Sequence, residues 1–210
     1  MEHPLQVQSS IRSATLYGAT ELGGANNYGI VYQLTPSASG WTETVIYSFT
    51  NGFDGAYPLG GLVMDGSGNL YGTTSGGGIG GGGTVFELSP SNGGWTFSVI
   101  QSLTGSQSGA GPRASLTLDS SGNLYGTTQQ NGPMACGNVF KLTPVNGRWT
   151  YTDLHDFTCG NDGGFVYGGV ALDRNGNLFG TTLYYGASGN NYCGVDYAPV
   201  GCGVVWTITP

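Results

Sequence analysis

The stretch Asp119-Ser120-Ser121-Gly122-Asn123-Leu124-Tyr125-Gly126-Thr127-Thr128 decides the fold, because closely similar stretches return at regular intervals along the chain. Its second half, Leu-Tyr-Gly-Thr-Thr, also begins at Leu70, and variants of it begin at Leu16 and Leu178. The interval between one starting point and the next is the same each time. A fixed period of this length, about 54 residues, is typical of a repeat protein in which every repeat folds as one structural unit.

Two further signatures keep the same period. A Val-x-x-Leu-x-Pro motif begins at Val31, Val85 and Val139, and a Trp-Thr pair begins at Trp41, Trp95 and Trp149. The fourth copy of the first motif begins only at Val205, later than the common period predicts, so the last repeat contains an insertion. We therefore expect a single domain over residues 1–210, with repeats over approximately 4–57, 58–111, 112–165 and 166–210.

One repeat reads as four short strands. β-branched and aromatic residues separated by Gly, Asn, Pro and Ser predict strands over Leu116–Leu118, Leu124–Thr128, Val139–Leu142 and Trp149–Phe157. We expect Pro144 to end the third strand, and simple alternation along the fourth to place His155 on the same face as Trp149. No stretch sustains a helical period. Four antiparallel strands in about 50 residues are typical of a propeller blade, so we predict an all-β fold, a β-propeller of four blades.

Both ends of the chain depart from this pattern. His3-Pro4-Leu5 lies one period before Tyr57-Pro58-Leu59, which predicts a degenerate first strand near Leu5–Val7. The fourth repeat has no Trp-Thr strand, so we expect its blade to be incomplete and its third strand to be an open edge, which proteins normally protect. The N-terminal segment could pair with this edge, a second copy of the chain could pair with it, or the chain could belong to a longer array.

Composition excludes several classes of protein. Gly accounts for 41 of 210 residues, only 8% of residues are charged, and the formal net charge is -7. Lys141 and four arginines cannot form a surface that follows a phosphate backbone, so we expect no nucleic-acid partner. No apolar run approaches the length of about 18 residues that a membrane helix requires, so we expect no membrane insertion.

The four cysteines all fall outside the repeat signatures, in loops. In a blade, the loop between the second and third strands opens on the same face as the connection to the next blade. Cys136 and Cys159 occupy these two positions in the third repeat, and Cys193 and Cys202 both lie in the long loop of the fourth repeat. We predict two disulfides, since no Cys-x-x-Cys pair or nearby histidine indicates a metal site. Disulfides indicate an oxidising compartment, so we expect a secreted or cell-surface protein.

The run Asp-x-x-Gly-Asn-Leu-Tyr-Gly-Thr-Thr, followed by Gly-Thr-Val-Phe-x-Leu-x-Pro, Trp-Thr and Asp54-Gly55-Ala56-Tyr57-Pro58, resembles the GloVer tandem repeat of secreted bacterial proteins. The resemblance covers nearly the whole chain and implies an extracellular, propeller-like array. It implies no activity. The first copy departs from it, because Ile11, Ala14 and Thr15 replace the Asp and the Gly-Asn turn, and in the last copy Val166 replaces the proline.

The loops between the second and third strands carry the candidate binding residues. They span residues 21–29, 75–83, 129–137 and 183–203, and the last contains the insertion. Aromatic and amide side chains in such a loop suit sugar recognition by stacking and hydrogen bonding. Aspartates of the connections between repeats share this face. The candidate ligand-binding residues are Asp54, Asp162, Tyr184, Tyr185, Asn191, Tyr192, Asp196 and Tyr197.

Few residues suit catalysis or metal binding. The chain has two histidines and shows no nucleophile elbow, histidine metal pair or phosphate loop. Asp65, Asp119 and Asp173 each open a Gly-Asn turn, where a capping role is expected. We therefore expect no metal site and no cofactor, with calcium left open. The first hypothesis is a non-catalytic binding or surface-display module for carbohydrate or protein. The alternatives are a hydrolase or lyase for a sugar or lactone using carboxylates, and a structural module that forms homo-oligomers through the edge of blade four.

Overall fold

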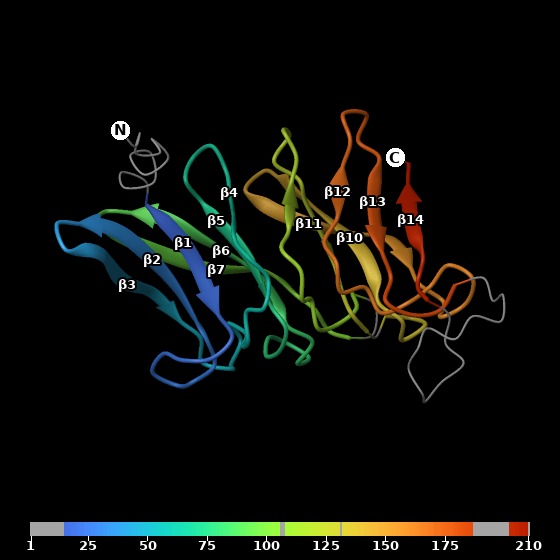
Figure 1. Cartoon of the computed structure of the whole chain (residues 1–210), viewed down its shortest axis with the longest axis horizontal. Coiled ribbons are helices and arrows are strands. Elements are labelled where there is room, and N and C mark those ends of the chain that lie inside the picture. Colours follow the sequence, from blue (N-terminus) through green and yellow to red (C-terminus); the bar gives the residue numbers. More distant parts are fainter. Residues whose placement is uncertain (1–14, 106–107, 131, 187–201, 210) are drawn as a thin grey trace, which may run out of the picture.

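A computed structural model describes residues 15–105, 108–130, 132–186 and 202–209. The fold of these residues is all-β, with four separate antiparallel sheets and no helix in the described ranges. Each sheet corresponds to one sequence repeat. The sheets follow one another from the N-terminal to the C-terminal end of the molecule, so that β1–β3 and β12–β14 lie at opposite ends (Figure 1).

The second and third sheets contain all four expected strands. The second has the order β4-β5-β6-β7, formed by Val63–Met64, Leu70–Thr74, Thr84–Ser91 and Gly94–Ser102. The third has the order β8-β9-β10-β11, formed by Thr117–Leu118, Leu124–Thr127, Asn138–Val145 and Arg148–Asp156.

Three strands are described in each end sheet. The first sheet contains β1 (Leu16–Thr20), β2 (Ile30–Ser37) and β3 (Gly40–Ser48), while the expected strand near Leu5–Val7 lies outside the described residues. The fourth contains β12 (Ala171–Leu172), β13 (Leu178–Thr181) and β14 (Val205–Ile208), with β14 at one edge.

The sheets pack face to face through three apolar clusters, one at each boundary between neighbours. Val31 and Phe49 of the first repeat contact Leu70, Phe86 and Leu88 of the second. Equivalent clusters join the second sheet to the third and the third to the fourth. The strand period explains this stacking, because alternate residues of one strand face opposite sides of the sheet and both sides are apolar. Residues of β6 show it directly: Phe86 packs toward the first sheet and Val85 toward the third.

The Gly-Asn turns form as predicted. The carboxylate of Asp119 accepts hydrogen bonds from the backbone N–H groups of Ser121 and Asn123, at 2.8 and 2.9 Å, and from the side-chain amide of Asn123 at 2.7 Å. Asp65 and Asp173 make the same bonds in their repeats. Each aspartate thus caps its own hairpin turn.

Two details of the expected strands are wrong. Pro144 does not end the third strand, which continues to Val145. Pairing with β9 stops at Leu142, so the proline, which has no N–H to donate, lies beyond β9 and pairs only with Trp149 of β11.

The second error concerns His155. A register shift between Val139 and Phe140 pairs these residues with His155 and Asp153, which leaves Leu154 as the extra residue of a β-bulge. The bulge turns His155 away from the face that carries Trp149 and Tyr151. The same irregularity occurs at the corresponding positions of the first two sheets.

Candidate functional site

One end of the four sheets is formed by loops, and we call it the loop face. It comprises the loops between the second and third strands of each repeat and the connections between sheets, at the lower end of the molecule in Figure 1. Its described residues fall within 21–29, 49–62, 75–83, 103–105, 108–116, 128–130, 132–137, 157–170, 182–186 and 202–204.

Backbone hydrogen bonds join the loop face from one repeat to the next. The connection that leaves each sheet pairs with the loop of the following sheet, as Ala56 does with Gly76, Ala110 with Gln130, and Gly164 with Tyr184. The N–H groups of Ala56, Ala110 and Gly164 donate to the partner carbonyls at 2.7, 2.8 and 3.0 Å. Side chains on this face are therefore held by a rigid scaffold, the setting in which loops most often bind ligands.

The structure places Asp54 inside one of these connections. Its carboxylate accepts hydrogen bonds from the Thr50 backbone N–H at 2.8 Å, the Thr50 hydroxyl at 2.6 Å and the Tyr47 hydroxyl at 3.1 Å. Burial raises the pKa of Tyr47 to about 12, and the neighbouring Asp54 carboxylate adds to this shift. Asp54 thus orders the turn of its own connection.

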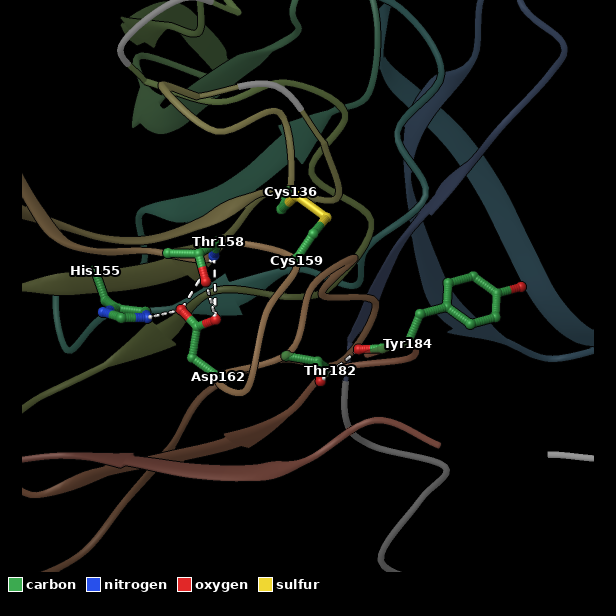
Figure 2. Close-up of polar contacts among 7 residues, drawn as sticks. All are labelled: Cys136, His155, Thr158, Cys159, Asp162, Thr182 and Tyr184. Atoms are coloured by element: carbon green, nitrogen blue, oxygen red, sulfur yellow. Dashed lines mark hydrogen bonds and ion pairs between the residues drawn. A yellow bond between two sulfur atoms is a disulfide. The ribbon is translucent and has the colours of Figure 1, made fainter. Parts of the chain in front are cut away.

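Asp162 takes the same position in the third repeat (Figure 2). The Thr158 backbone N–H donates to its Oδ2 at 3.0 Å, the Thr158 hydroxyl donates to its Oδ1, and His155 Nε2 lies 3.1 Å from Oδ2. Burial alone would raise the pKa of Asp162, but the hydrogen bonds from Thr158 and His155 outweigh it and lower the pKa. Asp54 and Asp162 bond to different groups in separate connections, so each carboxylate serves its own turn.

The second repeat differs from its neighbours at these positions. Ser108 replaces the aspartate and caps the turn with its hydroxyl, which accepts from the Thr104 N–H at 2.8 Å. Gln101 occupies the position of Tyr47 and His155. Smaller, uncharged groups therefore replace a carboxylate and a ring at this point of the second sheet.

A recess lies where these smaller groups face the third sheet. Its volume is about 460 Å³, and it is lined by Gln101, Thr104, Ser108, Pro133, Tyr151 and Asp153. Thr104, Ser108 and Pro133 belong to the loop face, so the recess lies at that end of the boundary between the second and third sheets. An aromatic ring, a side-chain amide, hydroxyls and a carboxylate line it, and its volume falls within the range of small-ligand pockets.

The third sheet carries two neighbouring carboxyl groups, Asp153 and Asp156, at or beside the recess. The amide of Asn138 donates to the Tyr151 hydroxyl at 2.9 Å and to Asp153 Oδ2 at 3.3 Å. Burial, followed by the negative charge of Asp153, raises the pKa of Asp156. One oxygen of Asp156 is buried and has no hydrogen-bond partner. Only Asp153 of this carboxyl pair lines the recess.

A second groove, of about 680 Å³, lies between the first two sheets and is lined in part by Trp95 and residues 90–94. These residues form the turn between β6 and β7, and Trp95 recurs as Trp41 and Trp149. The groove therefore reflects features that every complete repeat shares. The recess instead depends on residues that distinguish the second and third repeats from the others.

The predicted disulfide between Cys136 and Cys159 is confirmed, with a Cα–Cα distance of 5.6 Å (Figure 2). Beside it, a Cβ added to Gly164 would lie 3.2 Å from Cys159 Sγ and 3.3 Å from the Tyr185 ring. The Phe165 ring packs against Tyr184 and Tyr185, with centroid distances of 5.8 and 6.2 Å. The disulfide and three aromatic residues thus form one group, and Figure 2 shows Tyr184 pointing away from Asp162.

The other predicted residues of the long loop are Asn191, Tyr192, Cys193, Asp196 and Tyr197, and they lie outside the described residues. Cys202 is disulfide-bonded, as predicted. Ligand binding by Tyr184 and Tyr185, by the two connection aspartates and by the undescribed residues remains a prediction.

One further group on the loop face was not predicted from the sequence. Arg113 donates to the side-chain oxygen of Gln129, whose amide donates to the Tyr167 hydroxyl, and the guanidinium lies 5.4 Å from the Tyr167 ring centre. A signal was present, because Arg113 and Tyr167 are one repeat period apart, at the position of Leu59 in the first connection.

Within the described ranges, no group of three or more His, Cys, Asp or Glu side chains is placed to hold a metal ion. The same part of the chain contains no helix with the length and apolar character needed to cross a membrane.

Comparison with known families agrees with this repeat architecture. The model of the Gloeobacter/Verrucomicrobia repeat matches residues 4–195. The chain belongs to this repeat family. This match confirms the expected resemblance to the GloVer repeat. No curated protein matches the chain.

Proposed function

We propose that this member of the Gloeobacter/Verrucomicrobia repeat family is a non-catalytic, extracellular module that binds carbohydrate through its loop face. The recess between the second and third sheets carries the proposal. Sugars are bound by aromatic rings together with amides, hydroxyls and carboxylates. In the recess the second sheet supplies the amide of Gln101, and the third sheet supplies the ring and hydroxyl of Tyr151 and the carboxylate of Asp153.

The arrangement of carboxyl groups favours binding over hydrolysis. Glycoside hydrolysis commonly uses two carboxyl groups on either side of the scissile bond, about 5–9.5 Å apart. Asp153 alone lines the recess, whereas Asp54 and Asp162 are engaged in the turns of separate connections. Asp156 neighbours Asp153 but does not line the recess, so the recess presents one carboxyl group and not two on either side of a bound sugar.

The proposal includes a propeller arrangement of the four sheets. Face-to-face stacking of consecutive three- or four-stranded sheets, each formed by one repeat, supports it. The Cys136–Cys159 disulfide supports an oxidising, extracellular location.

Binding to a panel of polysaccharides and immobilised glycans tests the function. The decisive variants replace recess residues by those of the first repeat, as in Asp153→Val, which mimics Val45, and Gln101→Tyr, which mimics Tyr47. We expect each to weaken binding at least about tenfold, the effect of losing one or two good hydrogen bonds. Glu43→Ala changes an exposed carboxylate of the first sheet and serves as the control.

Tyr184→Ala separates the recess from the aromatic group of the fourth repeat. Loss of binding in Tyr184→Ala, with unchanged binding in Asp153→Val, would move the site to that group. Absence of binding to every glycan tested would refute carbohydrate recognition.

A further inference from the structure

The outer face of the fourth sheet is more exposed than the equivalent face of the second and third sheets. Val205 is 80% exposed, whereas Val31, Val85 and Val139 at the same repeat position are fully buried. Phe179 is 38% exposed, and its counterparts Tyr71 and Tyr125 are 5% and 8% exposed. In the first three repeats this face, which we call the trailing face, packs against the following sheet.

The outer face of the first sheet shows the complementary exposure. Leu16 is 43% exposed, whereas Leu70, Leu124 and Leu178 at the same position are almost fully buried. Tyr32 and Leu34 are less buried than their counterparts in the second sheet, Phe86 and Leu88, which are fully buried. In the other three repeats this face, the leading face, packs against the preceding sheet.

The two uncovered faces are therefore the two halves of one interface, which the chain already forms three times. At the boundary of the second and third sheets, Tyr71 and Val85 of a trailing face contact Leu124 and Phe140 of a leading face. The free trailing face presents Phe179 and Val205, and the free leading face presents Leu16 and Tyr32 in the same places. Both faces are apolar at these exposed positions, so water contact with them is unfavourable.

We infer that a second copy of this chain covers these surfaces, by docking its leading face on the trailing face of the first. The contact is head-to-tail, so it generates a ring where the rotation closes and an extended array where it does not. It differs from pairing at the edge of β14, because it buries side chains of both end sheets and does not require main-chain hydrogen bonds between copies.

Two variants test the inference by complementation. Val205→Glu places a charge on the trailing face and Leu16→Glu places one on the leading face, both at exposed positions that folding does not require to be apolar. Sedimentation velocity over a concentration series should show reversible self-association of the wild type. Each variant alone should associate at least about tenfold more weakly, because the contact would bury an unpaired carboxylate. A mixture of the two should form a 1:1 heterodimer, since it retains one intact pair of faces.

Phe53→Glu provides a matched control, because Phe53 is 79% exposed but lies on the loop face, and this variant should associate like the wild type. Thermal melts followed by circular dichroism verify that all variants are folded. A wild type that remains monomeric at every concentration would overturn the inference. Association that Leu16→Glu leaves intact would also overturn it, and would assign the contact to another surface such as the β14 edge.

Discussion

Phe86 of β6 lies directly over Gly72, its cross-strand partner in β5, and a Cβ placed on this glycine would come within 2.5 Å of the ring. A side-chain carbon of Leu62 would lie 2.8 Å from the same Cβ. Phe86 is fully buried and cannot move aside without disturbing the first boundary between sheets. We expect Gly72→Ala to lower the free energy of unfolding by about 1–3 kcal/mol, the usual cost of overpacking a core.

Urea denaturation measures this change, and Gly66→Ala is its control. No atom lies within 4 Å of a Cβ added to Gly66. Restricting the unfolded chain by a Gly→Ala change stabilises the fold where the backbone permits alanine, so an equal loss of stability in both variants would show that contact with Phe86 does not explain the effect.

The Cys136–Cys159 disulfide should contribute substantially to stability. It closes a loop with a sequence separation of 23 residues, for which chain entropy predicts about 3 kcal/mol. The Cys136→Ser/Cys159→Ser double variant should therefore unfold at lower temperature than the wild type. Differential scanning calorimetry measures the shift, and an unchanged melting temperature would contradict a stabilising role.

The three turn aspartates should make the fold sensitive to acid. Burial opposes ionisation of Asp119, but hydrogen bonds from Asn123, Ser121 and Tyr125 outweigh it and lower its pKa. Because the folded-state pKa lies below the unfolded value of about 3.9, the ionised carboxylate stabilises the fold at pH values above about 3.9. This stability is lost as pH falls through the folded-state pKa. Stability measured by urea denaturation should therefore be level near neutral pH and decrease below about pH 4.

Asp119→Ala should lower stability near neutrality by about 1 kcal/mol, the typical contribution of such hydrogen bonds, and should make the decrease in acid shallower. A variant whose acid profile parallels that of the wild type would show that other carboxylates cause the decrease.

Most of the fold could be predicted because it is encoded locally. The Asp119 turn depends on residues within four positions of one another, and the repeat period returns the same encoding in each sheet. The extension of β10 past Pro144 could not be predicted, since it depends on where pairing with β9 stops. The position of His155 depends likewise on a bulge set by Val139 and Phe140 on the neighbouring strand.

The recess could not be predicted in the same way because no single segment contains it. Gln101 and Ser108 come from the second repeat, and Tyr151 and Asp153 come from the third. No one of these side chains indicates a binding site by itself, and the recess forms only where the two sheets stack with smaller side chains at their boundary. The repeats, compared position by position, carry its sequence signals: Ser108 stands at the position of Asp54, and Gln101 at the position of Tyr47.

Asp156 should be a carboxylate whose removal stabilises the protein. Burial and the neighbouring Asp153 raise its pKa, and one of its oxygens is buried without a hydrogen-bond partner. A folded-state pKa above the unfolded value means that stability is lost as pH rises from the unfolded to the folded pKa. Asp156→Ser introduces the residue that Ser48 and Ser102 supply in the other repeats. We expect it to raise the free energy of unfolding at pH 7 by about 0.5 kcal/mol, since solvent screens a partly exposed carboxylate, and to change it little at pH 3. Chemical denaturation at both pH values measures this difference, and destabilisation at pH 7 would show that the charge of Asp156 is compensated in the folded state.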